Sequence, residues 1–308
     1  MASISIVVPT FNRPKLLPRA VRSALLACPK DGQVIVVDDH SVIPAISVLK
    51  DISDIRLRVV SNGYEKGASG ARNFGVLTAF GDVIFFLDDD DEMYPDYCRR
   101  VMKSGFHQSS AGYCAIEHIE LDGSTQIISR RGLNRGLIPD RASMRKKIAG
   151  FQMGFWIRKE VFQELGCLDP LLTTDEDTDF TIRMCSESIG LWYDPDPGVR
   201  QYSHLTTNKG GQLTKTTPKD VVARNYLRTL TKNHATFPPL HRARWFLLSR
   251  FLRRAIEADE YRLAWRVTMD IKPLYLSICG FVLLSVRTIA RLRRQLTAIL
   301  IDQIFTQR

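Results

Sequence analysis

The sequence predicts an α/β fold with a mostly parallel central sheet and flanking helices, followed by a C-terminal α-helical extension. Three observations lead to this prediction. Strand and helix patterns alternate through the first 90 residues, which is typical of a parallel sheet with helices on both faces. Three of the strand patterns end in polar sequence, at residues 10–13, 38–41 and 88–91. Beyond residue 239 the chain changes to basic, amphipathic helical sequence.

Four strands are predicted from apolar runs rich in β-branched residues. They are residues 3–8, closed by Pro9, and residues 34–37, 56–60 and 83–87. The run at 34–37 is apolar without interruption, as expected for a strand that is covered on both faces. In such sheets ligands bind beyond the carboxyl ends of the strands, so the polar strand ends predict one common site.

Two helices are predicted between these strands. Asn12 is expected to cap the first helix, which has Pro14 in its first turn and breaks before Gly32. The second helix is expected to end near Gly81. Its expected buried face consists of Ala71, Phe74 and Leu77.

The middle of the chain is less regular. A hairpin that turns at Asp122-Gly123 is expected from residues 113–120 and 126–130. Helical patterns follow at residues 158–165 and 178–186. We therefore expect one large α/β domain over residues 1–238 and a basic helical extension over residues 239–308.

The net charge of +10 is unevenly distributed. Residues 240–308 hold 13 Lys or Arg and 5 Asp or Glu, a net charge of +8, which leaves +2 for the rest of the chain. The main domain therefore lacks the basic groove of a nucleic-acid-binding protein, and nucleic acid is not an expected partner. We expect the extension to meet an anionic partner instead.

The extension has the pattern of a membrane-surface segment. Residues 241–258 form a basic amphipathic helix, and residues 273–286 are uncharged and mostly apolar before a cluster of arginines. Such a stretch is too short to cross a bilayer, which needs about 20 helical residues. We expect an interfacial helix on an anionic membrane surface. A packed helical cap with solvated arginines and a dimer interface are the alternatives.

The cysteines favour a reducing compartment. The six are scattered without a C-x-x-C pair, which indicates neither a zinc site nor a disulfide framework. The first residues lack the basic region of a secretory signal and run directly into a strand pattern. We expect a cytoplasmic protein that is peripheral on the inner face of the plasma membrane.

The most distinctive polar segment is Asp88-Asp89-Asp90-Asp91, directly after a predicted buried strand. Adjacent carboxylates repel one another, and a hard divalent cation relieves that repulsion. Oxygen ligands suit Mg²⁺ or Mn²⁺, and a nucleotide diphosphate would complete the coordination shell. A solvated acidic turn is the alternative, because runs of aspartate are common on protein surfaces.

Two further segments could contact a nucleotide. Asp38-Asp39 ends the second strand, where a carboxylate can accept hydrogen bonds from a base or a ribose, or form an Asx-turn. Gly67 and Gly70 precede a helix with Arg72 in its first turns, a pattern that allows close approach to phosphates. The phosphate-binding and dinucleotide-binding loop motifs are both missing, so a loop glycine beside a surface arginine is the alternative.

Carboxylates also open the helix near residue 178. Asp177 could serve as a general base, and a helix start tends to keep such a group ionised; helix capping is the alternative. Asp179 and Arg183 are four residues apart and are expected to form a structural ion pair. His204 follows an apparent strand end and could join a metal site or contact a diphosphate, although a lone histidine is more often structural.

Taken together, these segments resemble the family 2 glycosyltransferases, which have the GT-A fold. The resemblance covers about residues 3–205. The matching segments are IVVPTFNR (6–13), VVDDHS (36–41), GARN (70–73), FLDDDD (86–91, with Pro95 shortly after), MGFWIR (153–158), LGCLD (165–169) and EDTDF (176–180, with Arg183). Their order and spacing carry the likeness.

The resemblance implies an inverting, metal-dependent transfer of a sugar from a nucleotide-diphosphate-sugar donor to an acceptor hydroxyl. It implies that Asp39 contacts the base, Asp88 contacts the ribose and Asp177 is the catalytic base. Further contacts to the nucleotide-sugar are implied for Pro9, Thr10, Asn12, Arg13, Arg72 and Asp89. The implied ligands of the Mn²⁺ or Mg²⁺ ion are Asp90, Asp91 and, because members of this branch often carry a late histidine, His204.

Two features leave alternatives open within this resemblance. Four adjacent aspartates leave the metal ligand open among Asp89, Asp90 and Asp91. Asp175 is a third acid beside Glu176 and Asp177, which leaves the choice of base open. The basic extension motivates a lipid-linked or cell-surface glycan as the acceptor.

Two other functions are the alternatives. A sugar-phosphate nucleotidyltransferase would carry a glycine-rich loop after the first strand, where this chain has residues 9–13 without glycine. A non-catalytic membrane scaffold that binds a nucleotide-sugar is disfavoured by the intact Asp177 and the aspartate run. The donor sugar, the linkage and the oligomeric state are not predicted by the sequence.

Overall fold

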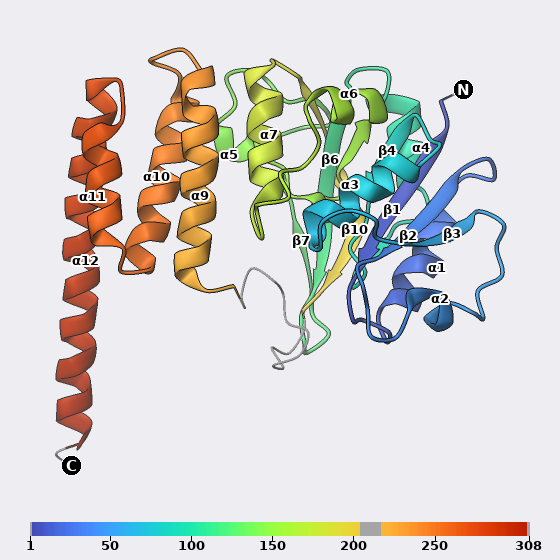
Figure 1. Cartoon of the computed structure of the whole chain (residues 1–308), viewed down its shortest axis with the longest axis horizontal. Coiled ribbons are helices and arrows are strands. Elements are labelled where there is room, and N and C mark those ends of the chain that lie inside the picture. The colour runs from blue at the N-terminus through green and yellow to red at the C-terminus, as the bar shows by residue number, and fades with distance from the viewer. Residues whose placement is uncertain (1, 204–216, 307–308) are drawn as a thin grey trace. The chain divides into compact units, whose positions relative to one another are not determined.

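The computed structural model describes residues 2–203 and 217–306, with side chains as far as residue 291. The chain forms two compact units, Met1–Thr216 and Thr217–Arg308. The first unit holds a large sheet with helices on it, and the second unit is helical (Figure 1). The division falls before α9 (Lys219–Asn233), whereas the sequence suggested a boundary after residue 238.

One sheet runs through the first unit. Its strands follow the order β3-β2-β1-β4-β9-β6-β10-β5, with β7 beside β6 and β8 beside β10. The bounds are β1 Ile4–Thr10, β2 Gln33–Asp38, β3 Leu57–Ser61, β4 Val83–Phe86, β5 Glu92–Met93, β6 Ala111–Ile119, β7 Thr125–Ile128, β8 Gly136–Leu137, β9 Trp156–Arg158 and β10 Leu191–Tyr202. Strands β1 to β4 are mutually parallel, as are β6 and β10, while β9 runs antiparallel between β4 and β6. The predicted α/β class with a mostly parallel sheet is confirmed.

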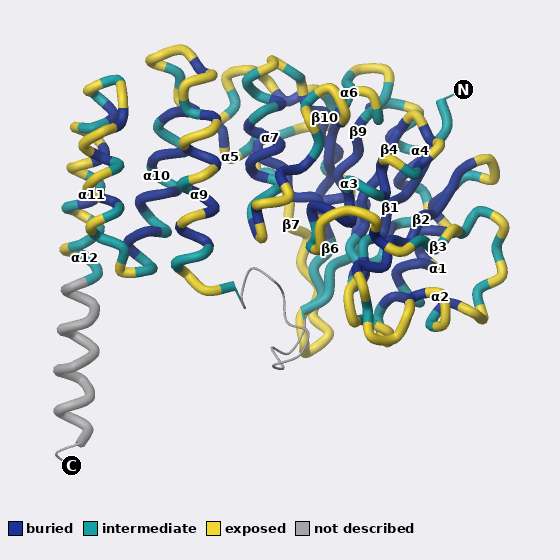
Figure 2. Tube along the Cα trace, viewed as in Figure 1, coloured by how far each residue is buried: buried dark blue, intermediate teal, exposed yellow. Residues whose placement is uncertain are grey.

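Helices cover this sheet, and the central strands are buried along most of their length (Figure 2). The helices of the first unit are α1 Leu17–Ala27, α2 Ala45–Val48, α3 Ala68–Thr78, α4 Tyr97–Arg100, α5 Met144–Lys147, α6 Lys159–Glu164 and α7 Glu176–Ser186. Helix α3 lies directly on β1 and β2. A Cβ atom on Gly75 would lie 2.4 Å from a methyl group of Val7, so this close approach requires glycine.

The first predicted helix begins later than expected. Asn12 does not cap it, because its side-chain oxygen accepts a hydrogen bond from the Val42 N–H at 2.8 Å. Residues after Arg13 form a turn, and α1 begins at Leu17 with Pro18 in its first turn. Strand β1 also continues through Pro9, which pairs in register with Val37. The segment between β1 and α1 is therefore a loop at the sheet edge.

Helix α3 also differs from its prediction. It ends at Thr78, three residues before Gly81, and its buried face includes Gly75 and Val76. Leu77 is half-exposed and does not belong to that face. Ala71 is buried and Phe74 packs against the core as predicted, so only Leu77 was wrongly assigned, because α3 approaches the sheet through Gly75.

Strands β5, β8 and β9 were not predicted, and of β10 only the end before His204 was expected. Strand β9 has only three residues, and β10 contains Pro195 and Pro197, which interrupt its pairing with β6. The predicted hairpin is confirmed as β6 and β7, which pair antiparallel. The two predicted helices after residue 158 are confirmed as α6 and α7.

The second unit consists of α9, α10 (Arg242–Glu257), α11 (Tyr261–Asp270) and α12 (Leu274–Thr306). Helix α10 is the predicted basic amphipathic helix, and His241 caps it by accepting a hydrogen bond from Ala243 N–H at 3.2 Å. Helix α12 continues well past the predicted apolar stretch. The segment Leu274–Arg291 is long and apolar enough to cross a membrane, so length alone does not exclude a span as the sequence argument supposed.

Candidate active site

The polar strand ends meet at the carboxyl edge of β1, β2 and β4. Thr10 pairs in register with Asp38 across β1 and β2, and the Leu87 N–H donates to the Val7 carbonyl as the chain leaves β4. The three segments that the sequence singled out therefore lie at one edge of the sheet, where parallel strands place their ligand sites.

The four aspartates after β4 divide into two groups. Three of them bring carboxylate oxygens within 4.8 Å of one another and form what we call the aspartate cluster: Asp88, Asp90 and Asp91. Asp89 accepts a hydrogen bond from the Thr10 hydroxyl at 2.7 Å, and its other oxygen lies 3.8 Å from Arg13 Nε. Burial raises the pKa of Asp89 to about 7, although the charge of Arg13 opposes this shift. Asp89 thus supports the loop from outside the cluster.

The aspartate cluster has the donor set of a hard divalent cation. Burial raises the pKa of Asp91 well above its usual range, and the charges of Asp88 and Asp90 raise it further. Gln201 donates to Asp91 at 3.4 Å, and Arg13 forms an ion pair with Asp90. Like charges held this close are unfavourable unless a cation joins them, so these oxygens fit Mg²⁺ or Mn²⁺.

The two aspartates that end β2 have different contacts. Asp38 holds the turn that follows it, accepting hydrogen bonds from two backbone N–H groups at 2.9 and 2.7 Å. Asp39 accepts from Asn62 Nδ2 at 2.7 Å and from the Gly67 N–H at 2.8 Å. Asp39 therefore joins β2 to the loop before α3. Sequence reasoning missed Asn62, although its place directly after the third strand was an available indication.

The first strand end forms a turn against the second. Asn12 adopts a left-handed conformation with φ 54°, and its N–H donates to the Ser41 hydroxyl at 2.9 Å. Pro9 is half-buried inside β1. Both residues therefore shape the backbone at this edge of the sheet.

Arg72 joins the aspartate cluster to the start of α7. Its Nη2 lies 2.7 Å from Asp88 Oδ1, and its Nη1 lies 2.7 Å from Glu176 Oε1. The arginine side chain is only 8% exposed, and the guanidinium lies 5.3 Å from the centroid of the Phe151 ring. Glu176 was quoted in the sequence pattern but was not predicted as a site residue; its place directly before Asp177 was the available indication.

Asp177 follows in the first turn of α7. Its side chain is partly buried, and Oδ1 accepts a hydrogen bond from the Thr178 N–H at 2.6 Å. Burial raises the pKa of Asp177 to about 7, and the charges of Glu176 and Asp175 raise it as well. The helix start was expected to keep this group ionised, but burial outweighs it. A carboxylate with this pKa can accept a proton near neutral pH.

The structure describes the predicted residue Asp179 but not His204. Asp179 is fully buried and pairs with Arg183 at 3.0 Å, while Arg183 also donates to the Cys167 carbonyl at 2.6 Å. The predicted structural ion pair is therefore present. His204 lies outside the described residues.

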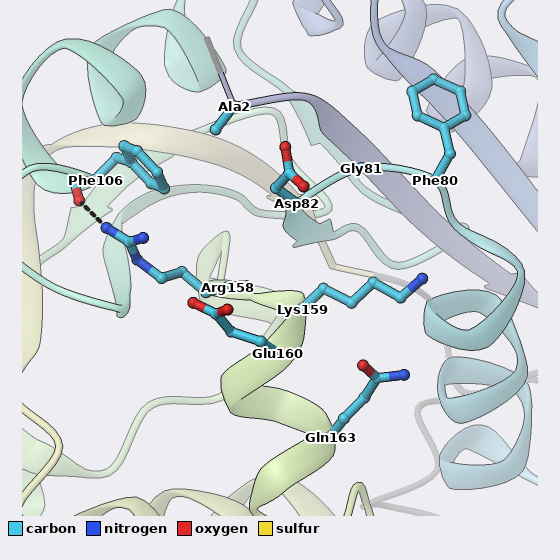
Figure 3. A pocket seen from close by; sticks show the side chains of 9 residues that line it. All are labelled: Ala2, Phe80, Gly81, Asp82, Phe106, Arg158, Lys159, Glu160 and Gln163. Carbon is cyan, nitrogen blue, oxygen red and sulfur yellow. Dashed lines mark hydrogen bonds between the residues drawn. The ribbon is translucent and has the colours of Figure 1, made fainter.

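A pocket of about 530 Å³ lies at the opposite edge of the sheet (Figure 3). It lies beside Ala2 and Asp82, which precede β1 and β4, and Phe106, Arg158 and Lys159 also line it. Arg158 Nη2 donates to the Phe106 carbonyl at 3.0 Å. None of the predicted site residues that the structure describes lines this pocket. The carboxylate chemistry therefore identifies the carboxyl edge as the candidate active site.

Comparison with known proteins agrees with this geometry. Residues 5–166, more than half of the chain, match the family described as Glycosyl transferase family 2. An uncharacterized glycosyltransferase of Haemophilus influenzae is 27% identical over 237 residues, which cover 74% of this chain and 78% of that protein. The GalNAc(5)-diNAcBac-PP-undecaprenol beta-1,3-glucosyltransferase of Campylobacter jejuni is 32% identical over 152 residues, 47% of each protein. This chain thus matches about half the length of that relative.

A solved structure shows the fold. The fragment 1–349 of TarS from S. aureus, in complex with UDP-GlcNAc, has a TM-score of 0.65 at 15% identity and covers 90% of this chain and 79% of that chain. The predicted GT-A fold is therefore confirmed. The matched family model covers the segments that carry the aspartate cluster, Asp39 and Arg72. The chain belongs to glycosyltransferase family 2.

Proposed function

We propose that this glycosyltransferase moves a sugar from a uridine-diphosphate-sugar to a hydroxyl group of a lipid-linked glycan, with inversion and with a divalent metal. The observation that carries this proposal is the bridge by Arg72, which joins the aspartate cluster to Glu176, the residue before Asp177. The bridge would thereby link the aspartates proposed to bind the donor to the helix that carries the proposed base. The UDP-GlcNAc in the TarS complex supports a uridine nucleotide, and the name of the Campylobacter relative supports a polyprenyl-linked acceptor.

The donor nucleotide would occupy the loops after β1, β2 and β3. Asp39 and its partner Asn62 are the proposed contacts to the base, and Asp88 is the proposed contact to the ribose. The loop with Thr10 and Arg13 supports the aspartates from one side, so both residues would border the diphosphate. Burial around Asp39 favours hydrogen-bonded recognition over a solvated turn.

Asp90 and Asp91 would hold Mn²⁺ or Mg²⁺, with Asp88 beside them and His204 as a further proposed ligand. A bound divalent metal supplies Lewis-acid stabilisation to a leaving diphosphate. The chain's own residues prepare the site. Arg13 offsets the charge of Asp90, and Gln201 holds Asp91 in place.

Asp177 is the proposed general base. It would take the proton of the acceptor hydroxyl as that oxygen attacks the anomeric carbon from the face opposite the diphosphate, which inverts the configuration. Such a single displacement needs a fixed geometry of the two substrates and no covalent intermediate. The bridge from Arg72 to Glu176 supports this fixed geometry because it ties the start of α7 to the donor loop.

A polyprenyl-linked acceptor would also determine where the enzyme works. We propose a cytoplasmic enzyme that is peripheral on the inner face of the plasma membrane, in polysaccharide or glycolipid biosynthesis. The basic C-terminal unit supports this location, since the segment 240–308 has a net charge of +8.

Calorimetric titration tests the donor site. UDP, GDP and dTDP are each titrated in the presence of Mn²⁺ and of EDTA into wild type, Asp90→Ala and Asp140→Ala, whose carboxylate is fully exposed. We expect UDP binding that requires Mn²⁺, is lost in Asp90→Ala and is retained in Asp140→Ala. No nucleotide binding under either condition would overturn the donor site. Binding without turnover on any polyprenyl-linked glycan would instead favour a nucleotide-sugar-binding scaffold.

A further inference from the structure

Helix α12 exposes a continuous apolar stripe. Its exposed large side chains recur at intervals of three and four residues, which places them on one side of a helix. We call these residues the apolar stripe: Leu274, Ile278, Phe281, Val282, Val286 and Ile289. On the neighbouring α11, Trp265 and Met269 are also exposed, and the Trp265 ring contacts the Phe281 ring with centroids 5.5 Å apart.

The other side of α12 is buried within the second unit. Leu276 and Leu284 are almost fully buried, and a Cβ atom on Gly280 would lie 3.1 Å from both Leu248 of α10 and Thr268 of α11. One side of α12 thus packs within the second unit, and the other side is exposed. Figure 2 shows this alternation of buried and exposed residues along α11 and α12. The stripe therefore takes no part in the core of the second unit, and its burial would require a partner outside that unit.

Three exposed basic side chains, and one exposed acidic one, Asp270, lie on α11 and in the turn that leads into α12. Arg262 and Arg266 are exposed on α11 beside Trp265, and Lys272 is exposed in the turn before α12. An apolar face with a basic border and aromatic rings is typical of helices that lie in the headgroup region of an anionic bilayer. A self-associating face would instead bring these cations against their own copies, which is unfavourable.

The same contacts decide how α12 meets a bilayer. The segment that could span a membrane, Leu274–Arg291, is the segment whose buried side lies against α10 and α11. Arg291 also bonds Asp259 at 2.7 Å and pairs with the Ile256 carbonyl at the end of α10. A spanning α12 would either break these contacts or draw the arginines of α10 into hydrocarbon, where a charge is costly.

We infer that α11 and α12 form a membrane-binding face, with α12 lying in the plane of an anionic bilayer and the apolar stripe inserted among the acyl chains. Arg262, Arg266 and Lys272 would contact lipid phosphates. This face would keep the enzyme on the surface that holds a polyprenyl-linked acceptor, a role that rests on the proposed function. The insertion itself depends only on the second unit.

Vesicle flotation tests the insertion. The full chain is mixed with vesicles of phosphatidylcholine, with or without phosphatidylglycerol, and compared with Ile278→Gln/Val282→Gln. Each substitution is expected to weaken binding about tenfold, because each removes one inserted aliphatic side chain. Ile55→Gln is the matched control, since Ile55 is equally apolar and fully exposed but belongs to the first unit. Equal flotation of the double variant and wild type would overturn the inference.

A second double variant tests the exposed arginines of α11. Arg262→Gln/Arg266→Gln is expected to lose the preference for phosphatidylglycerol, about fivefold per arginine, while its weak binding to phosphatidylcholine remains. Circular dichroism checks that each variant is folded, which is expected because all substituted side chains are exposed. Unchanged preference for the anionic lipid would contradict the role of these arginines.

A depth measurement distinguishes an α12 that lies in the plane of the bilayer from an α12 that spans it. Cys279 is exposed on α12, so a fluorophore can be attached there in a Cys167→Ser/Cys185→Ser background, the remaining cysteines of the first unit being buried. A second label is placed with Cys279→Ser/Ile289→Cys. The two positions are about 15 Å apart along the helix. Lipid-attached quenchers should report equal, shallow depths for both labels; a difference near the full separation would show a spanning helix and overturn the inference.

Two further readouts keep the outcomes distinct. If the chain fails to float but forms dimers that Ile278→Gln/Val282→Gln dissociates, the stripe is an interface between copies, and the membrane-binding face is overturned. UDP binding is measured on the same variants. Retained UDP binding with lost flotation leaves the donor site intact, whereas flotation without UDP binding contradicts the proposed function and not the membrane-binding face.

Discussion

Arg72 donates a hydrogen bond to Glu176 at 2.7 Å, although the two residues are 104 positions apart in the chain. The same guanidinium bonds Asp88 at an equal distance. One buried cation therefore joins the loop of the aspartate cluster to the helix whose first turn holds the proposed base. Its removal would leave two carboxylates without their partner in a largely buried setting.

Replacing Arg72 by methionine should therefore destabilise the fold strongly. We expect the free energy of unfolding to fall by about 3–5 kcal/mol, measured by denaturant titration. The double variant Arg72→Met/Glu176→Gln should recover part of this loss, because one uncompensated charge is gone. Arg99→Met, at an exposed arginine of α4, should change stability by less than about 0.5 kcal/mol. Equal losses in the single and double variants would argue against the bridge.

Transfer activity should follow the ionisation of Asp177. Burial and two neighbouring acids raise the pKa of this group to about 7, and only its carboxylate form can accept the acceptor proton. The turnover rate with saturating substrates should fall as pH falls through about 7, by close to tenfold per pH unit on the acid side. Asp177→Asn should bind UDP but lack transfer activity. A rate that stays constant across this range would exclude Asp177 as the base.

The same raised pKa makes a prediction for stability. Asp177 titrates near its ordinary value of 3.8 in the unfolded chain and near 7 in the folded chain. Folding stability from this group is therefore highest at low pH, declines as pH rises between the two values, and stays low above about 7. Asp177→Asn should unfold at a higher temperature than wild type at mildly alkaline pH, and the difference should vanish in acid. A less stable variant at alkaline pH would contradict the unfavourable burial of this charge.

Metal binding should distinguish the aspartates. A ligand at 100 times its dissociation constant stabilises a fold by about 2.7 kcal/mol, so Mn²⁺ should raise the melting temperature of wild type, and EDTA should reverse the effect. Asp91→Asn should lose this response. Asp89→Asn should keep it, because Asp89 bonds Thr10 and lies outside the aspartate cluster. A response that is lost in Asp89→Asn and kept in Asp91→Asn would identify Asp89 as the metal ligand instead.

Two glycines test the packing of α3. Gly75→Ala should lower the free energy of unfolding by about 1–3 kcal/mol despite the better helix propensity of alanine, because the new methyl group would overlap Val7. Gly190→Ala is the control, since its Cβ would meet only Leu137 at 3.5 Å, an ordinary contact. Comparable unfolding curves for Gly75→Ala and wild type would show that α3 can move away from the sheet at little cost.

The fold class could be predicted because buried parallel strands have a recognisable sequence pattern. Uninterrupted apolar runs such as residues 34–37, followed by polar strand ends, indicate both the sheet and the edge where ligands bind. The sequence did not predict the body of β10, only its end, because Pro195 and Pro197 contradict strand propensity and are accommodated by irregular pairing with β6. Nor did it predict β9, whose three residues are too few for a periodic pattern.

The site residues were predicted by type and place but not by orientation. The run of four aspartates could not reveal that Asp89 turns toward Thr10, because that choice depends on one hydroxyl from a strand 79 positions away. Glu176 became a site residue only through its long-range contact with Arg72. The pKa of Asp177 likewise depended on burial, which the capping position did not indicate.

The pairing of β5 with β10 has a consequence for how the chain folds as the ribosome synthesises it. The aspartate loop begins at β4, beside β1, but its far end is held by β5, whose partner residues are Val199 and Arg200. Gln201, which contacts Asp91, lies 110 positions downstream of it. A ribosome releases the amino-terminal strands first, and contacts distant in sequence form late. The nascent chain therefore completes the surroundings of the aspartate cluster only after β10 has emerged, so a half-made chain lacks the contact between Gln201 and Asp91.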